Sequence, residues 1–183
     1  MATKLSLYNG ALINHLGERG LNSLTEARKP RRVLDRIWDA GFVDGILEDG
    51  FWNFSTRTME SNYDTDITPS FGYKYAHEKP SDWLRTSDVS VSDFFGDPLN
   101  SYTDESGFWW CDHEIIYIRY ISNDAVYGGS LADWPESVTE YAETKLAALA
   151  CLSITQDKSL KAALDDKADR LLKVAKGRDS MND

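Results

Sequence analysis

Residues 50–54 decide the fold, and they read Gly50-Phe51-Trp52-Asn53-Phe54. They follow directly on a helical pattern, so the glycine ends the helix and the aromatic side chains enter a core. Further on, residues 71–85 read as an aromatic strand, a turn at Pro80 and the start of a second strand. Neither run contains a nucleophile beside a base, a glycine-rich phosphate loop or a metal-binding cluster. Both are packing signals, which indicates a protein that works through its shape.

Aromatic side chains are the expected anchors of this core. Trp52 and Phe54 are expected where the helices meet the β segment, and an apolar helical stripe precedes them. The anchor candidates are Trp38, Trp52, Phe54, Tyr75 and Trp83.

Composition limits the function classes. The chain has 183 residues, 42% of them hydrophobic, enough for one domain with a core or one domain carrying an insertion. Aromatic residues make up 12%, which suits either an aromatic-rich β core or an assembly surface. The net charge is −10, and nonspecific duplex binding requires a basic surface, so we do not expect the chain to grip DNA. An acidic wall could let DNA slide past, or the charge could serve solubility alone.

Cysteine usage and hydropathy indicate where the protein is made. Cys111 and Cys151 lie outside any Cys-x-x-Cys motif and are expected to remain thiols in a reducing compartment. No apolar run approaches the ~20 residues of a membrane-spanning helix. The first residues lack the apolar stretch of a signal peptide, so we expect a protein made in the cytoplasm, without a membrane partner. We expect no metal ion and no cofactor.

The N-terminal part is expected to form two helices. Apolar residues recur at helical spacing over residues 5–16, and Gly17 suits a C-terminal cap. A second helix is expected over residues 30–48, with Pro30 in its first turn. Gly41 and Gly45 lie one turn apart in it. Because glycine is unfavourable in a helix, either another surface approaches them closely or they loosen the helix end.

Residues 51–130 read as β structure. Strands are expected near residues 54–63, 72–77, 84–92, 107–111 and 114–122, separated by turn-rich spacers. Residues 115–121 are apolar on both alternating faces. This pattern predicts a central strand covered on both sides, or a strand covered on one side by a neighbouring subunit.

Two more helices are expected at the C-terminal end. One begins with Asp133 as its cap, and the other runs from Asp157 to about residue 176, where Gly177 ends it. The predicted fold is therefore α+β, a four-helix antiparallel bundle from residues 1–50 and 131–177 with an antiparallel β domain inserted at 51–130. Residues 178–183 are expected to form a flexible C-terminal tail.

The histidines offer a catalytic alternative. His77 precedes Glu78, and His113 lies between Asp112 and Glu114. Neighbours along a strand point to opposite faces, and metal sites need several converging ligands, so the pattern favours turn or strand-start positions. A small hydrolase-like enzyme using His77 or His113 with a carboxylate stays an alternative function, as does an acidic monomeric binding module.

A basic cluster stands out in an acidic chain. It consists of Arg28, Lys29, Arg31 and Arg32. It lies at a helix start, where cations are unfavourable beside the helix dipole. The cluster is therefore a candidate interface for an acidic partner or for phosphates, and the alternative is a solvated loop.

The order of short motifs along the chain carries a family resemblance over roughly residues 5–175. The motifs are Leu16-Gly17-Glu18, Leu24-Thr25-Glu26, Arg31-Arg32-Val33-Leu34-Asp35, Trp52-Asn53-Phe54, Tyr73-Lys74-Tyr75-Ala76, Pro80-Ser81-Asp82-Trp83-Leu84-Arg85, Ile116-Tyr117-Ile118-Arg119-Tyr120 and Trp134-Pro135. In this order they resemble the head-to-tail adaptor family of tailed bacteriophages, called tail tubular protein A in short-tailed phages.

The resemblance implies a structural virion protein and no enzymatic reaction. Its members form a ring of about twelve copies between the portal protein and the tail nozzle or tube. Double-stranded DNA passes through the ring without specific binding. The protein would be in the host cytoplasm during assembly and then in the neck or tail of the virion. The candidate portal contacts are Lys176, Arg178, Asp179 and Met181.

Overall fold

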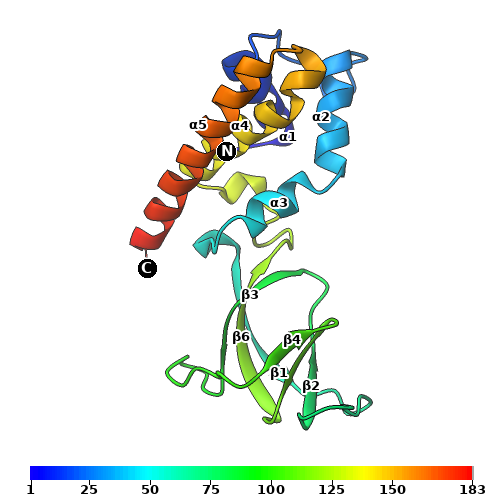
Figure 1. Cartoon of the computed structure of the whole chain (residues 1–183), viewed down its shortest axis with the longest axis vertical. Coiled ribbons are helices and arrows are strands. Elements are labelled where there is room, and N and C mark those ends of the chain that lie inside the picture. Colours follow the sequence, from blue (N-terminus) through cyan, green and yellow to red (C-terminus); the bar gives the residue numbers. More distant parts are fainter. Residues whose placement is uncertain (183) are drawn as a thin grey trace.

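The computed structural model describes residues 1–182, without the side chain of residue 182. The helices gather at one end of an elongated molecule and the strands at the other (Figure 1). Over the described residues the fold is α+β, with five α-helices and two three-stranded antiparallel sheets. None of these helices is long and apolar enough to cross a membrane.

The first expected helix is two elements. Helix α1 (Lys4–Asn9) begins with a capping box, in which the Thr3 side chain accepts from the Ser6 backbone N–H at 3.1 Å. It continues as the π-helix η1 (Gly10–His15), where the Leu16 N–H donates to the Ala11 carbonyl five residues back.

The expected single helix over residues 30–48 is wrong. Helix α2 (Lys29–Asp39) and helix α3 (Phe42–Glu48) are separated by Gly41, whose φ of 94° is left-handed. Only glycine adopts this conformation without strain, so Gly41 turns the chain and starts a new helix. The expected close approach is not made by the chain itself, since a Cβ built on Gly41 or Gly45 meets nothing within 4 Å.

The β domain consists of two sheets. The strands are β1 (Thr56–Asn62), β2 (Tyr75–Glu78), β3 (Trp83–Ser90), β4 (Thr103–Glu105), β5 (Phe108–Cys111) and β6 (Ile115–Ser122). One sheet has the order β1-β6-β3 and the other β2-β5-β4, and all pairs are antiparallel. A small core of side chains from β3, β5 and β6 contains Val89, Trp109, Cys111, Ile116, Ile118 and Tyr120.

Strand β6 is the central strand, and it is covered mainly on one face. Ile116, Ile118 and Tyr120 are fully buried in the β core. Ile121 points the other way and joins the core of the helices. Ile115, on the same face as Ile121, is exposed. The expectation of a strand covered on both sides therefore holds only where β6 reaches the helices.

The C-terminal helices begin and end at other residues than expected. Helix α4 (Glu136–Ile154) starts after Pro135, because Asp133 belongs to a preceding 3₁₀ turn, η3 (Leu131–Asp133). Asp157 does cap α5 (Lys158–Asp179), accepting from the Ser159 and Leu160 N–H groups at 2.9 and 3.0 Å. Gly177 does not end α5, which continues through it and into the 3₁₀ turn η4 (Ser180–Asn182).

The predicted four-helix antiparallel bundle is wrong. Helix α4 is the centre of the helical part, and it packs against α5, α2, α1 and η1. Helices α1 and α3 are too short to run the length of α4, with 6 and 7 residues against 19. A bundle requires helices of similar length side by side. Here the division at Gly41 and the π-helix produce unequal helices around a central one.

Candidate functional site

Three stretches that are far apart in the sequence, residues 46–54, 80–85 and 134–135, meet where the helices join the β domain. The Trp52 ring is fully buried, stacks near Phe54 with centroids 6.2 Å apart, and donates its indole N–H to the Ile46 carbonyl at 3.0 Å. Phe54 in turn lies 6.2 Å from the ring of Trp134. We call this region the junction, and it is built around Trp52, Phe54 and Trp134. The other anchor candidates lie elsewhere: Trp38 packs against the helical core, Tyr75 lies beside Tyr63 on β2, and Trp83 contacts Trp109 in the β core.

Residues 80–85 connect the two cores. Neighbouring side chains of a strand point to opposite faces, and here Trp83 packs on the β core while Leu84 packs on the helical core. Arg85 reaches back to the helices, where its guanidinium donates to the Glu48 carbonyl at 3.2 Å and lies 3.9 Å from the centre of the Phe51 ring. This short motif therefore ties strand β3 to the end of α3.

Asp82 holds the same end of the first sheet together. Its carboxylate accepts hydrogen bonds from Arg57 on β1 at 2.9 Å, from Tyr120 on β6 at 3.2 Å and from Ser122. Burial by itself would raise the pKa of Asp82, but the hydrogen bonds from Ser122 and Arg57 outweigh it and hold that pKa below its usual value. The carboxylate is thus engaged in structural bonds.

The C-terminal end of α5 is fastened to the junction. The Asp179 carboxylate accepts from the Asn53 backbone N–H at 3.0 Å, and the Asn53 side-chain amide donates to the Asp179 carbonyl at 3.0 Å. Asp179 is only 9% exposed. The part of the expected flexible tail that reaches Asp179 is therefore helical and bonded to the junction. Asn53 and Arg85 were not expected at a functional site.

Two surface hollows flank this helix end, and together they include all four candidate portal contacts. The first has a volume of 440 Å³ and is lined by residues 135–138, Arg178, Asp179 and Met181. The second has a volume of 350 Å³ and is lined by residues 50–52, Arg85, Lys176, Asp179 and Ser180. Met181 is 83% exposed beside the first hollow. The structure thus places Arg178 and Met181 beside one hollow and Lys176 beside the other, with Asp179 lining both.

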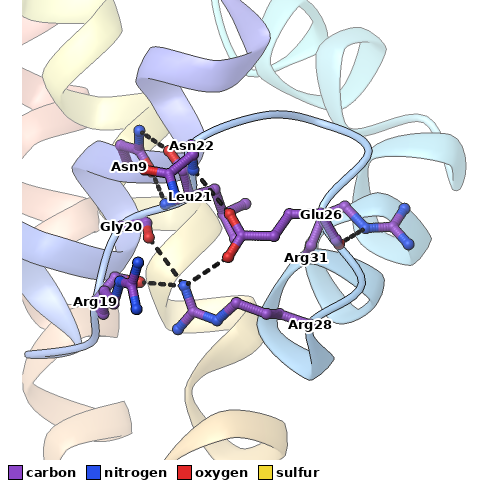
Figure 2. A network of polar contacts seen from close by, with 8 residues as sticks. All are labelled: Asn9, Arg19, Gly20, Leu21, Asn22, Glu26, Arg28 and Arg31. Carbon is purple, nitrogen blue, oxygen red and sulfur yellow. Dashed lines mark hydrogen bonds and ion pairs between the residues drawn. The ribbon is translucent and has the colours of Figure 1, made fainter.

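Two members of the basic cluster, Arg28 and Arg31, form contacts within the chain (Figure 2). Arg28 donates to the carbonyls of Arg19 and Gly20 at 3.0 and 2.9 Å and lies 3.7 Å from the Glu26 carboxylate. Arg31 donates to the Glu26 carbonyl at 2.7 Å and forms an ion pair with Asp35.

The remaining contacts of Figure 2 hold the same loop. Glu26 accepts from the Asn22 N–H at 2.8 Å, and Asn9 exchanges two hydrogen bonds with Leu21. Arg28 and Arg31 therefore fasten the loop between η1 and α2. Lys29 and Arg32 are exposed, and neither has an ion pair within residues 1–182.

The histidines are not paired with carboxylates in the described chain. His77 is fully buried, and its Nε2–H donates to the His113 carbonyl at 2.9 Å while Nδ1 lies 3.2 Å from the Ser61 hydroxyl. Burial lowers the pKa of His77, although hydrogen bonding to the backbone of His113 and Ser61 acts to raise it. His113 is exposed at the strand start. Nor do three His, Cys, Asp or Glu side chains converge as metal ligands anywhere in residues 1–182.

Comparison with known proteins adds no relative. No protein-family model matches the chain, and no curated protein matches its sequence. The candidate site is therefore defined by geometry alone: the junction and the C-terminal end of α5 beside it.

Proposed function

We propose that this chain is a head-to-tail adaptor of a tailed bacteriophage. Copies of it would form a ring that joins the portal protein to the tail nozzle or tube and continues the DNA channel. The role is geometric, because many modest contacts repeated around a closed ring give a durable joint.

One observation carries the proposal. Three of the motifs on which the family resemblance rests, Trp52–Phe54, Pro80–Arg85 and Trp134–Pro135, lie far apart in the sequence but converge at the junction. Their convergence on packing positions supports a shared architecture rather than a shared reaction.

The charge pattern agrees with a channel protein. The net charge of −10 disfavours nonspecific adhesion of DNA to the chain as a whole, so a duplex could move past a ring of such chains. The C-terminal end of α5 supplies a surface suited to the portal. There the exposed Met181 and the cationic Arg178 line one hollow, and Lys176 lines the other.

The test combines the purified chain with purified portal rings encoded by the same genome. Native mass spectrometry should show a portal complex heavier by about 250 kDa, which is 12 × 20.7 kDa. Met181→Asp should weaken the complex at least about tenfold, because a new carboxylate would have to be desolvated in the contact. Val126→Asp is the matched control, since Val126 is also exposed, at 79%, but lies in the loop after β6. Absence of binding, or one adaptor chain per portal chain without a ring, would overturn the proposal.

A further inference from the structure

An open apolar groove crosses the helical part between α2, α3 and α4. Its volume is 460 Å³, and a cavity of about 150 Å³ already holds a benzene ring. The lining is Arg36, Ile37, Ala40, Gly41, Phe42, Gly45, Lys145 and Leu149. Apolar side chains form the floor, and the two cations Arg36 and Lys145 stand at its margin.

Gly45 keeps this groove open. It lies inside α3, its backbone does not need the left-handed conformation, and a Cβ placed on it would meet nothing within 4 Å. Glycine is unfavourable at such a position compared with alanine, and no internal contact compensates for it. The absent side chain therefore leaves room that the described chain itself does not fill.

The β domain carries a side chain suited to that room. Phe94 is 86% exposed, in the segment after β3 that projects sideways from the β domain, green in Figure 1. Isolated exposed apolar side chains are common, but among the large hydrophobic side chains of residues 2–181 Phe94 has the highest exposure.

Hydrogen bonds hold the Phe94 loop in shape. Val91 N–H donates to the Asp97 carbonyl at 3.2 Å, and the Ser90 hydroxyl donates to the same carbonyl at 2.8 Å. Phe95 has a left-handed φ of 55°, which is strained for an aromatic residue, and Arg119 lies 3.9 Å from its ring centre. Phe95 is thus held against β6 while its neighbour Phe94 points outward.

The charges of the loop and the groove are complementary. Phe94 is flanked by Asp93 and Asp97, and the groove margin holds Arg36 and Lys145. Lys145 is paired with Asp49, but Arg36 has no ion pair within residues 1–182. An apolar side chain between two carboxylates fits an apolar slot beside cations better than it fits the rest of an acidic surface.

We propose that Phe94 of one copy of this chain occupies the groove of the next copy. The loop and the groove lie on different parts of the molecule. If the contact is made head to tail, and not exchanged reciprocally by two copies, its repetition closes a ring or extends a filament. A phenylalanine buries about 150–250 Å², far less than a stable interface of about 1,600 Å², so one contact is weak and the closed ring gives it strength. The inference rests on the proposed adaptor ring for that closure.

The test places the photo-crosslinker benzoylphenylalanine at position 94 of the full chain, with the portal ring present and absent. Irradiation should attach position 94 to residues 36–45 or 145–149 of a second copy, as mapped by mass spectrometry. The same crosslinker at position 126 serves as the control and should not reach the groove. Attachment to any other surface, to the portal alone, or to nothing under both conditions would overturn the inference.

Gly45→Leu provides the matched blocking variant. Its side chain should fill the groove and reduce the yield of groove cross-links at least about tenfold, while the melting temperature stays at or above the parent value. Undiminished cross-links in folded Gly45→Leu would overturn the inference. The two proposals fail separately: groove cross-links without portal binding would remove the adaptor role alone, and portal binding without groove cross-links would remove the groove contact alone.

Discussion

Replacing Trp52 by alanine tests whether the junction holds the two parts of the chain together. The indole is fully buried and stacks near Phe54, and its N–H satisfies the Ile46 carbonyl. Truncating a buried tryptophan to alanine costs about 3–5 kcal/mol, from lost burial and from the cavity left behind. The unpaired carbonyl places the expected loss toward the upper part of that range. Against a total stability of about 5–15 kcal/mol, this is a large fraction.

Equilibrium unfolding in urea measures the loss. With a slope of about 2 kcal/mol per molar urea, a loss of about 4 kcal/mol lowers the midpoint by about 2 M. Phe51→Ala is the matched control, because Phe51 is the neighbouring aromatic residue and is 47% exposed. It should lose about 1 kcal/mol or less, mainly from its contact with the Arg85 guanidinium. Trp52→Phe should fall between the two, since it keeps an aromatic ring but leaves the Ile46 carbonyl without its donor.

Equal midpoint shifts for Trp52→Ala and Phe51→Ala would refute the reasoning. The same holds if Trp52→Ala lowers the midpoint by less than about 0.5 M at an unchanged slope, since the slope reports the surface exposed on unfolding. Either result would mean that the indole contributes no more than a surface side chain. The junction would then not be the feature that connects the helices to the β domain.

Two further perturbations follow from the contacts of single residues. Because the pKa of His77 is lowered in the folded chain, the unfolded chain takes up a proton first on acidification. The contribution of neutral His77 to stability is therefore present above about pH 6.5 and is lost as the pH falls toward the folded-state pKa. Urea midpoints between pH 7.5 and 5 should fall less steeply in His77→Gln than in the parent, His113→Gln should keep the parent slope, and a His77→Gln curve parallel to the parent's would contradict this. Asp179→Ala removes the acceptor of the Asn53 N–H and should lower the free energy of unfolding by about 1–3 kcal/mol. The exposed Met181→Ala is the control and should change it by no more than about 0.5 kcal/mol. Equal melting temperatures for the two variants would show that the end of α5 is not fastened to the junction.

The sequence predicted where most helices and strands lie, but not where a helix is interrupted or changes type. Local apolar spacing predicted helical structure over residues 5–16 and 30–48, and the chain is helical there apart from residues 16 and 40–41. The π-helix at residues 10–15 has no local signature, because the same apolar spacing suits α and π turns. It accompanies the close approach of the Glu143 carboxylate to Gly10, a contact between residues far apart in the sequence.

Strand β4 was missed although its turn was noticed. Residues 103–105 are polar and short, so no alternation marks them as a strand. The signal lies in the turn that follows, where Ser106 and Gly107 both have positive φ, as a two-residue hairpin requires. A Ser-Gly turn directly before the aromatic strand β5 favours a partner strand directly before the turn, and β4 is that strand.

The end of α5 could not be predicted from local pattern. Gly177 followed by polar residues is typical of a helix stop, and the penalty for glycine inside a helix is about 1 kcal/mol. The bonds between Asn53 and Asp179, which are 126 residues apart, offset a penalty of that size and extend the helix. The surroundings of the candidate portal contacts at this helix end depend on a tertiary contact that no local rule contains.

Gly41 and Gly45 form one pattern in the sequence, but the structure gives them different explanations. They lie four residues apart, and the sequence left two explanations open for both: a surface that approaches closely, or a loosened helix end. Gly41 needs no such surface, because its φ of 94° explains a glycine on backbone grounds alone. Gly45 has no backbone reason and no close neighbour, so the original argument applies to it alone and points outside the described chain. Under the proposed contact, Phe94 of a second copy would occupy the space that Gly45 leaves open over the groove.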